Sequence, residues 1–315
     1  MDSLKVIYSY ILLTNGCADA AKVVSAFANV SWLQLEMRIS KQNLRRTDTE
    51  DLYVRSLCVP TPDEMLLASR AGLRALSLHN AQLAAHEPTA IQDVERVAFD
   101  AHTDTLLLLV LPPNVLPPNA NNYQLVSLRR NASEWLEVHR LNTSFEYISG
   151  PGVMEVCDSR VLLGESGGNT LYIFNVSAAH TLRAADSLSL QNTTFRKVAC
   201  ARRDGDTLVA FSHSSSVSLQ RLASLPLRLE RLASVDFTDP HRLLFRGDLL
   251  FVTDWNSTSD THVIVSLRAS GNAFTERRVL LDAQPGVGLG PWALSGDRLV
   301  LWDSNSEDLL VYTFA

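Results

Sequence analysis

The sequence lacks several features that would assign it a function at once. No apolar run approaches the roughly 18 residues needed to cross a bilayer, so we expect a soluble body without a membrane span. The formal net charge is -6 and basic residues are interspersed with acidic ones, which speaks against a general nucleic-acid binder. No Gly-x-Ser-x-Gly elbow, P-loop or dinucleotide fingerprint occurs, so nucleophilic and nucleotide chemistry have no motif.

Histidine and cysteine form neither a metal-binding nor a disulfide pattern. The eight histidines show no metal-ligand spacing, and we expect neither a metal nor another cofactor. Loss of an N-terminal leader would remove Cys17 and leave Cys58, Cys157 and Cys200, an odd number for a disulfide framework. The cysteines therefore favour a cytoplasmic location.

The N-terminus and the sequons favour the opposite location. Lys5, the apolar residues 6–13 and the small residues 18–20 imitate the three regions of a secretory signal. Six Asn-x-Ser/Thr sequons would fit a glycosylated product, at Asn29, Asn131, Asn142, Asn175, Asn192 and Asn256. A secreted, receptor-like binding domain therefore stays an alternative.

A repeat defines the architecture. With 46% hydrophobic and 20% charged residues among 315, the chain can bury a large core. Six intensely apolar segments recur, with their last residues 42, 54, 47, 42 and 49 positions apart, at 65–68, 107–110, 161–164, 208–211, 250–253 and 299–302. This spacing is the period of a β-propeller blade.

Each apolar segment is one strand of a larger unit. Gly- and Asp-rich turns precede most of them and indicate tight hairpins to inner strands at 96–99, 154–157, 197–200, 242–245 and 292–294. Third strands are predicted at 73–78, 123–128, 171–176, 217–222, 262–267 and 309–314, and outer strands at 135–141, 182–188, 229–235 and 276–281. The predicted fold is an all-β, six-bladed propeller of four-stranded antiparallel blades.

The last unit ends after its third strand, so closure of the ring needs a strand from the other end of the chain. Residues 52–57 are predicted to supply it, which gives a propeller over 49–315 and a mainly helical cap over 1–48. The Pro- and Asn-rich residues 111–122 are predicted to be a loop insertion in the second blade.

One unit carries a family resemblance. Residues 249–255 read Leu-Leu-Phe-Val-Thr-Asp-Trp and are followed by Val-Ile-Val-Ser-Leu at 263–267 and Ala-Ser-Gly at 269–271. This unit, with Leu-Trp-Asp-Ser at 301–304, resembles the six-bladed YWTD repeats and more broadly the NHL and lactonase propellers. The resemblance implies the architecture, and some of these folds imply a metal-dependent hydrolase.

A second resemblance concerns the N-terminal segment. Residues 4–35 contain two apolar stretches that end near Trp32 and are similar to an F-box, which docks to a ubiquitin-ligase scaffold. This resemblance implies a substrate adaptor. A helical cap or signal segment explains the same residues.

Carboxylates recur after the apolar strands, at Glu165, Asp254 and Asp303. They could be metal ligands, but recurrence once per blade is typical of a structural device. We expect each carboxylate to accept hydrogen bonds from backbone amides and tie neighbouring turns together, as the resembling repeats imply.

The residues that begin the inner strands should line the channel. They include more bases than the two carboxylates Glu95 and Glu155, so a bare dication would be repelled. An anionic or peptide-like ligand suits this mixture, and we predict a ligand-binding mouth from Arg96, Glu155, Arg196, His241, Arg242 and Trp292. Alternatively, these groups pair with one another in a wet channel.

By elimination, the sequence favours a non-enzymatic scaffold that binds another protein through a ring face or the central mouth. No catalytic residue is assigned. Cys157 and Cys200 occupy similar places in adjacent inner strands, and we expect them to be small buried core thiols rather than a redox pair. The hydrolase, the F-box adaptor and the receptor-like domain stay open as alternatives.

Overall fold

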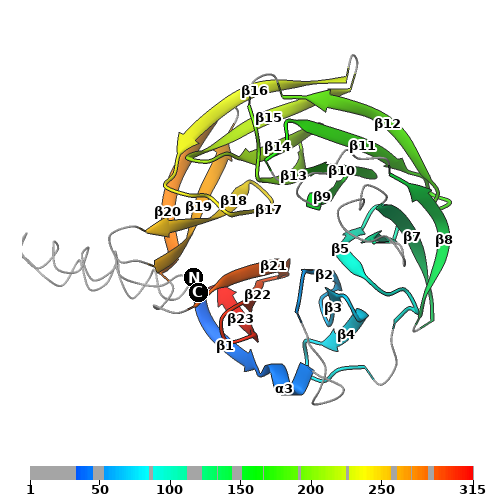
Figure 1. Ribbon diagram of the computed structural model, residues 1–315. Coiled ribbons are helices and arrows are strands. Elements are labelled where there is room, and N and C mark those ends of the chain that lie inside the picture. Colours follow the sequence, from blue (N-terminus) through cyan, green and yellow to red (C-terminus); the bar gives the residue numbers. More distant parts are fainter. Residues whose placement is uncertain are drawn as a thin grey trace, which may run out of the picture.

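The computed structural model describes residues 33–44, 53–84, 88–111, 123–132, 134–143, 151–165, 167–190, 193–224, 227–256, 261–270, 272–282 and 287–314. These residues form a ring of six antiparallel blades around a central axis (Figure 1). Within those ranges five blades have four strands and one has three. The predicted all-β, six-bladed propeller is confirmed.

In five blades the strands run outward from the axis in sequence order, and in the sixth the N-terminal strand β1 (Leu33–Ile39) lies outside the last three strands of the chain. The inner strands are β2 (Ser56–Thr61), β5 (Val94–Asp100), β9 (Pro151–Cys157), β13 (Lys197–Arg203), β17 (Arg242–Arg246) and β21 (Leu289–Ser295). The second strands are β3 (Glu64–Ser69), β6 (Thr105–Val110), β10 (Arg160–Glu165), β14 (Asp206–Ser212), β18 (Leu249–Asn256) and β22 (Arg298–Asp303). All six second strands lie where the apolar segments predicted them.

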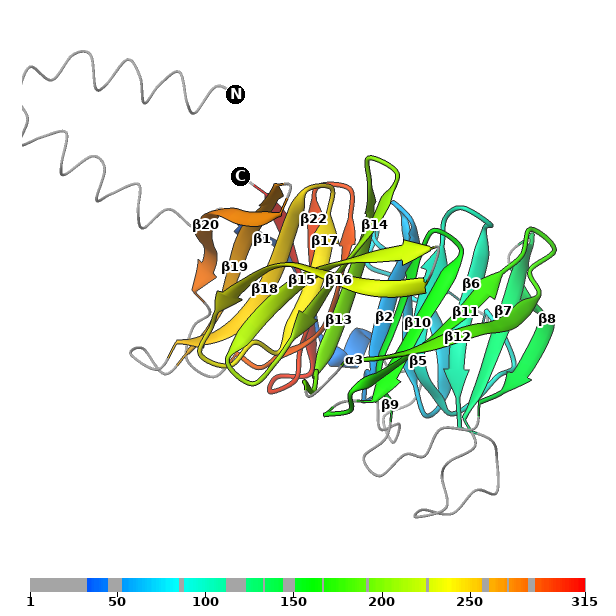
Figure 2. The same cartoon turned by 90° about the horizontal axis from the view of Figure 1, so that it is seen from above.

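The third strands are mostly buried, and the outer strands carry most of the exposed positions. The third strands are β4 (Gly72–Ser77), β7 (Gln124–Asn131), β11 (Thr170–Val176), β15 (Ser216–Ser224), β19 (Thr261–Ser270) and β23 (Asp308–Phe314). The outer strands are β8 (Glu134–Asn142), β12 (Leu182–Ser189), β16 (Leu227–Asp236), β20 (Ala273–Asp282) and β1 (Leu33–Ile39). Figure 2 shows the blades standing side by side around the ring.

The apolar second strands are buried because a neighbouring blade covers each of their faces. In β6, Leu107 and Leu109 pack toward the following blade, whereas Leu106 and Leu108 pack toward the preceding one. Six hydrophobic clusters fill the six junctions between blades in this way. A strand buried on both faces reads as a continuous apolar run, which is the repeat seen in the sequence.

The predicted turns supply the backbone conformations that tight hairpins need. Asp204 and Gly205 connect β13 to β14 with φ values of 50° and 87°. Two successive left-handed residues make a type I′ turn, whose twist matches that of the two strands. The inner strands are thereby held against their second strands on the axial side of each blade.

The N-terminal strand β1 closes the ring, and the prediction for residues 52–57 was wrong. β1 pairs antiparallel with β23, from Leu33 opposite Phe314 to Ile39 opposite Leu309. The predicted segment instead runs into β2, the inner strand of the first blade, where Leu57 lies opposite Leu67. The error arose because the first apolar strand needs an inner partner of its own, and the nearest upstream strand supplies it.

The propeller therefore begins earlier than the predicted boundary at residue 49. Residues 33–39 form a strand, and the helix α3 (Lys41–Leu44) follows it. The side chain of Leu44 is buried beside Val54 and Trp302, at the junction between the last and first blades. The rest of the predicted cap, at 1–32 and 45–48, lies outside the described residues, as does most of the F-box-like segment.

The first blade is the one with three strands. Its edge strand β4 carries a single bridge from Leu76 to Leu83, together with hydrogen bonds between Ser77 and Gln82 and between Ala84 and Ala75. These contacts stand where the other blades have a full outer strand. The predicted insertion falls between β6 and β7, and its residues 112–122 lie outside the described ranges.

Two of the recurring carboxylates act as predicted. Asp254 accepts hydrogen bonds from the backbone amides of Thr238 and Asp239, at 3.2 and 2.7 Å. Asp303 accepts from the amides of Gly288 and Asn305, at 2.9 and 3.0 Å. Both carboxylates are buried and tie the end of a second strand to a neighbouring loop.

Candidate functional site

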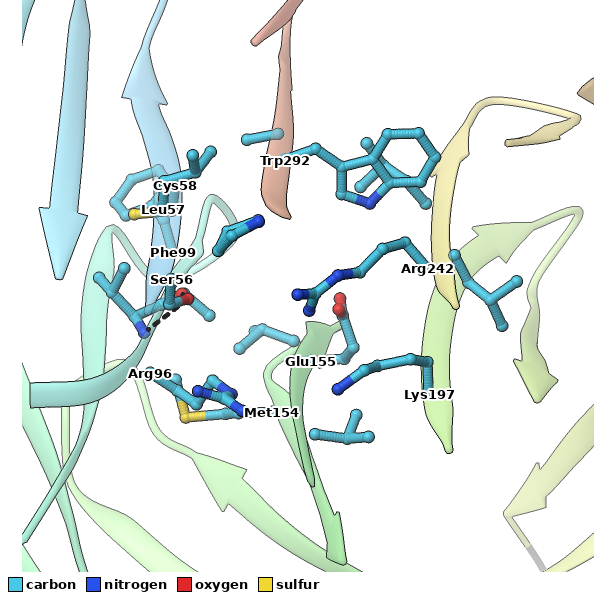
Figure 3. A pocket seen from close by; sticks show the side chains of 18 of the residues that line it. Ser56, Leu57, Cys58, Arg96, Phe99, Met154, Glu155, Lys197, Arg242 and Trp292 are labelled. Carbon is cyan, nitrogen blue, oxygen red and sulfur yellow. Dashed lines mark hydrogen bonds between the residues drawn. The ribbon is translucent and has the colours of Figure 1, made fainter. Parts of the chain in front are cut away.

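A cavity of about 380 Å³ lies on the axis of the ring. Residues from the inner strands of all six blades line it, and each inner strand contacts the next around the ring. Alternate residues of an inner strand point to opposite sides, toward the junctions with the two flanking blades, as Leu57 and Cys58 of β2 do. Consecutive residues of each inner strand border the cavity. Figure 3 shows Lys197, Arg242 and Glu155 pointing toward the middle of this space.

The cavity is rich in positive charge. Arg96 of β5, Lys197 of β13 and Arg242 of β17 line it together with Arg55, which lies just before β2. Glu155 of β9 is the one carboxyl among the described lining residues. Aromatic and apolar side chains complete the wall, including Phe99, Met154, Phe245 and Trp292.

Three of the four bases, Arg55, Arg96 and Lys197, have partners at the wall. Arg55 forms an ion pair with Glu95, which does not line the cavity. The Nη1 atom of Arg96 donates to the carbonyl oxygen of Glu95 at 2.7 Å. For the Arg242 guanidinium, in contrast, no hydrogen-bond or ion-pair partner lies among the described residues.

Lys197 is an amine held in a desolvated and cationic environment. Its Nζ atom donates to the carbonyl oxygen of Gly152 at 2.9 Å. Burial lowers the pKa of Lys197 to about 7, and repulsion from Arg242 and Arg96 adds to the decrease, while Glu155 opposes it. The lysine is therefore poised between its charged and neutral forms near neutral pH.

The pKa values of Glu155 and Arg242 are also shifted by burial in this cavity. Burial, followed by the effect of Cys157, raises the pKa of Glu155 to about 8, and Lys197 only partly offsets the shift. Burial and the neighbouring Arg96 lower the pKa of Arg242 to about 10. Although Glu155 faces the lumen, it lies deep within the ring, where the surrounding protein disfavours its charged form.

Four of the six residues predicted for the mouth line this cavity: Arg96, Glu155, Arg242 and Trp292. Arg196 and His241 do not, because each precedes the first residue of its inner strand. The prediction omitted Lys197 and Arg55. Lys197 is the first residue of β13 and pairs with Ser212, whereas Arg196 lies just before the strand.

Arg196 and His241 meet at a separate polar cluster around Asp239. Arg196 forms an ion pair with Asp239, and the Nε2 atom of His241 lies 3.1 Å from the other carboxylate oxygen. The ring of His241 lies 5.8 Å from that of His262, which in turn contacts Trp255 edge to face at 4.8 Å. Burial lowers the pKa of His262, and the nearby His241 adds to this effect.

Cys157, the last residue of β9, lies beside Cys200 in the middle of the neighbouring strand β13. Their thiols are hydrogen-bonded, which lowers the pKa of Cys157, whereas burial raises that of Cys200 well above its ordinary value. Cys157 is buried and Cys200 is partly buried. Their placement agrees with the expectation of small thiols packed in the wall of the ring.

Within the ranges that the structure describes, no three or more His, Cys, Asp or Glu side chains are grouped so as to hold a metal ion. In the same ranges no helix has the length and apolar character needed to cross a bilayer.

The chain is similar to solved structures in its fold, but it matches no known family in its sequence. No protein-family model matches it, and no curated protein matches it in sequence. A protein of unknown function from Bacteroides thetaiotaomicron has a TM-score of 0.54 at 10% identity, over 85% of this chain and 70% of that one. The β-propeller domain of Cps50 (Swd1) from Myceliophteria thermophila has a TM-score of 0.51 at 9% identity, over 90% of this chain and 100% of that one.

An enzyme is among the similar structures. Hydrazine synthase from Kuenenia stuttgartiensis has a TM-score of 0.54 at 9% identity, over 86% of this chain and 79% of that one. At such identities a shared fold does not imply a shared function. These similarities support neither the finer YWTD, NHL and lactonase resemblance nor the F-box resemblance. What they show is that this chain has the β-propeller fold.

Proposed function

We propose that the protein is a non-enzymatic binding module that receives an acidic segment of a partner protein at its central channel. The observation that carries this proposal is the excess of lumen bases, Arg96, Lys197 and Arg242, over the one lining carboxyl, Glu155. Arg55 is left out of this balance because it is paired with Glu95.

The electrostatic state of these groups supports an anionic ligand. Lys197 and Arg242 both have lowered pKa values because burial, and then repulsion from neighbouring bases that include Arg96, disfavours their charged forms. An anion close to them would reverse this penalty, since an opposite charge within a few ångströms favours the charged form of a base. Glu155 with its raised pKa keeps a proton near neutral pH, so it can donate a hydrogen bond to the anion rather than repel it.

The size of the cavity limits what enters it. A volume of about 380 Å³ is near the lower end of ligand pockets, which span roughly 300–1,000 Å³. One acidic side chain or a chain-terminal carboxylate fits this space, and a folded domain does not. The rest of the partner would lie on the ring face.

An exposed aromatic residue next to the channel suits such a partner. The side chain of Tyr53 is 62% exposed. It is close enough to Arg242 to influence the pKa of that guanidinium. Tyrosine beside arginine is enriched where proteins bind one another, because the ring offers apolar area and the guanidinium offers fixed donors.

Peptide binding tests the proposal. A fluorescent peptide rich in Asp and Glu, and a basic peptide of equal length, would be titrated with the protein and followed by anisotropy. We expect binding of the acidic peptide alone, weakened by salt, and an affinity loss of about tenfold or more in an Arg96→Met, Arg242→Met double variant.

The matched control is Arg228→Met on β16. Arg228 is exposed and pairs with Glu230 on the outside of the ring, so its loss should leave the affinity within about twofold. Equal binding of both peptides, or equal losses in the channel and control variants, would contradict the proposal.

A further inference from the structure

Lysine is rare in this chain, and one lysine lies in the channel. The sequence contains four lysines, Lys5, Lys22, Lys41 and Lys197, among 28 basic residues. Lys41 lies on the outside of the ring and forms an ion pair with Glu307. The other bases that line the cavity are arginines, which stay protonated and are not nucleophiles. Lys197 is therefore the one amine among the described lining residues.

The position of this amine is fixed by the fold. Its Nζ atom is anchored at 2.9 Å to the carbonyl oxygen of Gly152, in the strand that also carries Glu155. Figure 3 shows the ends of Lys197, Glu155 and Arg242 directed into one space. An amine, a carboxyl group and a guanidinium thus face a ligand from three neighbouring inner strands, β13, β9 and β17.

Two of the three charged groups that act on Lys197 lower its pKa. Arg96 and Arg242 lower its pKa by repulsion, added to the larger effect of burial, and Glu155 is the one group that opposes them. A lysine beside other cations in a desolvated site keeps part of its population as the free amine at neutral pH, and such amines attack carbonyl groups. The same cations attract a carbonyl compound that carries a carboxylate.

We infer that Lys197 captures a small anionic aldehyde or ketone, such as a 2-oxo acid, as a Schiff base in the central channel. Arg96 and Arg242 bind the carboxylate of that compound, and Glu155 acts as the proton donor. This inference rests on the proposed anion site but concerns its chemistry rather than its partner.

The proposed step balances in atoms and charge. The lone pair of the Lys197 amine attacks the carbonyl carbon, a C–N bond forms, and a proton moves from nitrogen to the former carbonyl oxygen. The protonated Glu155 carboxyl then gives its proton to that hydroxyl group, the C–O bond breaks, and water leaves. The nitrogen lone pair completes the C=N bond, which leaves an iminium ion beside the Glu155 carboxylate.

Borohydride trapping tests this step. The full-length protein would be incubated at pH 7 with pyruvate, the iminium would be reduced with cyanoborohydride to a stable secondary amine, and the labelled lysine would be located by peptide mass spectrometry. At this pH a lysine with a pKa of about 7 has a neutral fraction roughly a thousandfold above that of an ordinary lysine. Because burial also slows access, we expect labelling of Lys197 at least about tenfold faster than that of Lys41.

Two variants distinguish the role of the Lys197 amine from that of the Glu155 proton donor. Lys197→Arg keeps a positive charge and a donor for Gly152 but has no nucleophilic amine, so channel labelling should disappear. Glu155→Gln keeps the size of the side chain but cannot give a proton, so trapping should slow by about tenfold or more. Thermal unfolding of each variant checks that it is folded.

Three outcomes are distinguishable. Selective labelling of Lys197 that is slowed in Glu155→Gln supports the inference. Labelling of Lys197 no faster than Lys41 overturns it, and if the acidic peptide still binds, the proposed binding function stands. If neither trapping nor peptide binding occurs, the channel is not an anion site and both proposals fail.

Discussion

Leu33 lies directly opposite Phe314 in the pairing of β1 with β23, so the two ends of the described propeller are joined side by side. In a ring, this junction is where strands distant in sequence must meet. The contacts that hold it should therefore contribute to the stability of the whole propeller rather than to one blade.

Two leucines of β1 provide a matched test of this junction. Leu33 is 2% exposed and packs with Phe251 and Leu280 of the neighbouring blade, whereas Leu35 in the same strand is 53% exposed. We expect Leu33→Ala to lower the free energy of unfolding by about 2–4 kcal/mol, because a cavity is left behind. Leu35→Ala should change it by less than about 0.5 kcal/mol. Urea unfolding followed by tryptophan fluorescence measures both, and equal effects would argue against closure through β1.

Much of the fold could be predicted because burial on both faces leaves a direct trace in the sequence. The run 106–110 is apolar throughout since blades cover both of its sides, and such runs repeat once per blade. The strand that closes the ring has no such sequence pattern. β1 has a mixed pattern with exposed positions, as any outer strand does, and residues 52–57 have the same character. Only the pairing with β23 distinguishes them.

The candidate site was predictable to the extent that strand starts can be located. Arg96, Glu155, Arg242 and Trp292 line the cavity, and of the adjacent bases Arg196 and Lys197 it is Lys197 that does so. Lys197 is the first residue of β13, and Arg196 lies before it. Register depends on a partner strand, so composition alone could not decide between two adjacent bases.

The buried carboxylate Asp254 gives a prediction about the loops between blades. Its two oxygens accept the amides of Thr238 and Asp239. Asp254→Ala leaves both amides without that acceptor, and we expect the free energy of unfolding to fall by about 2–4 kcal/mol. Asp239→Ala removes the contacts of Asp239 with Arg196 and His241, which are all partly exposed. It should therefore lower the free energy of unfolding by less than about 1 kcal/mol. A larger loss in Asp239→Ala would be inconsistent with this role for Asp254.

The pair of thiols Cys157 and Cys200, on the inner strands β9 and β13, gives a prediction about reactivity. The hydrogen bond from Cys200 lowers the pKa of Cys157. Cys200→Ala removes that bond, so the apparent pKa of Cys157, measured from its pH-dependent alkylation by iodoacetamide, should rise. Cys58 lies on β2 and its pKa is raised by burial, so Cys58→Ala should leave the alkylation of Cys157 unchanged. An unaltered profile in Cys200→Ala would show that the hydrogen bond has no effect.

Glu155 and Lys197 together predict an unusual dependence of stability on pH. The unfolded Glu155 carboxyl ionises near 4.5, whereas the folded one keeps its proton to about 8. Between these values the folded state binds more protons, so stability falls as the pH rises. For Lys197 the folded pKa is about 7 and the unfolded value about 10.5. In that window the unfolded state binds more protons, so stability rises with pH.

Together the two contributions give the free energy of unfolding a minimum near pH 7–8. Glu155→Gln should remove the fall between pH 5 and 7.5, so its gain over the wild type should grow across that range to a few kcal/mol. Lys197→Met should remove the rise between pH 8 and 10 and leave the acidic side unchanged. Urea midpoints at half-unit pH steps measure both differences, and parallel curves for wild type and variants would mean that these groups titrate alike in the folded and unfolded states. An anion that binds in the channel should raise the free energy of unfolding at this minimum, because it stabilises the charged form of Lys197 and is bound only by the folded ring.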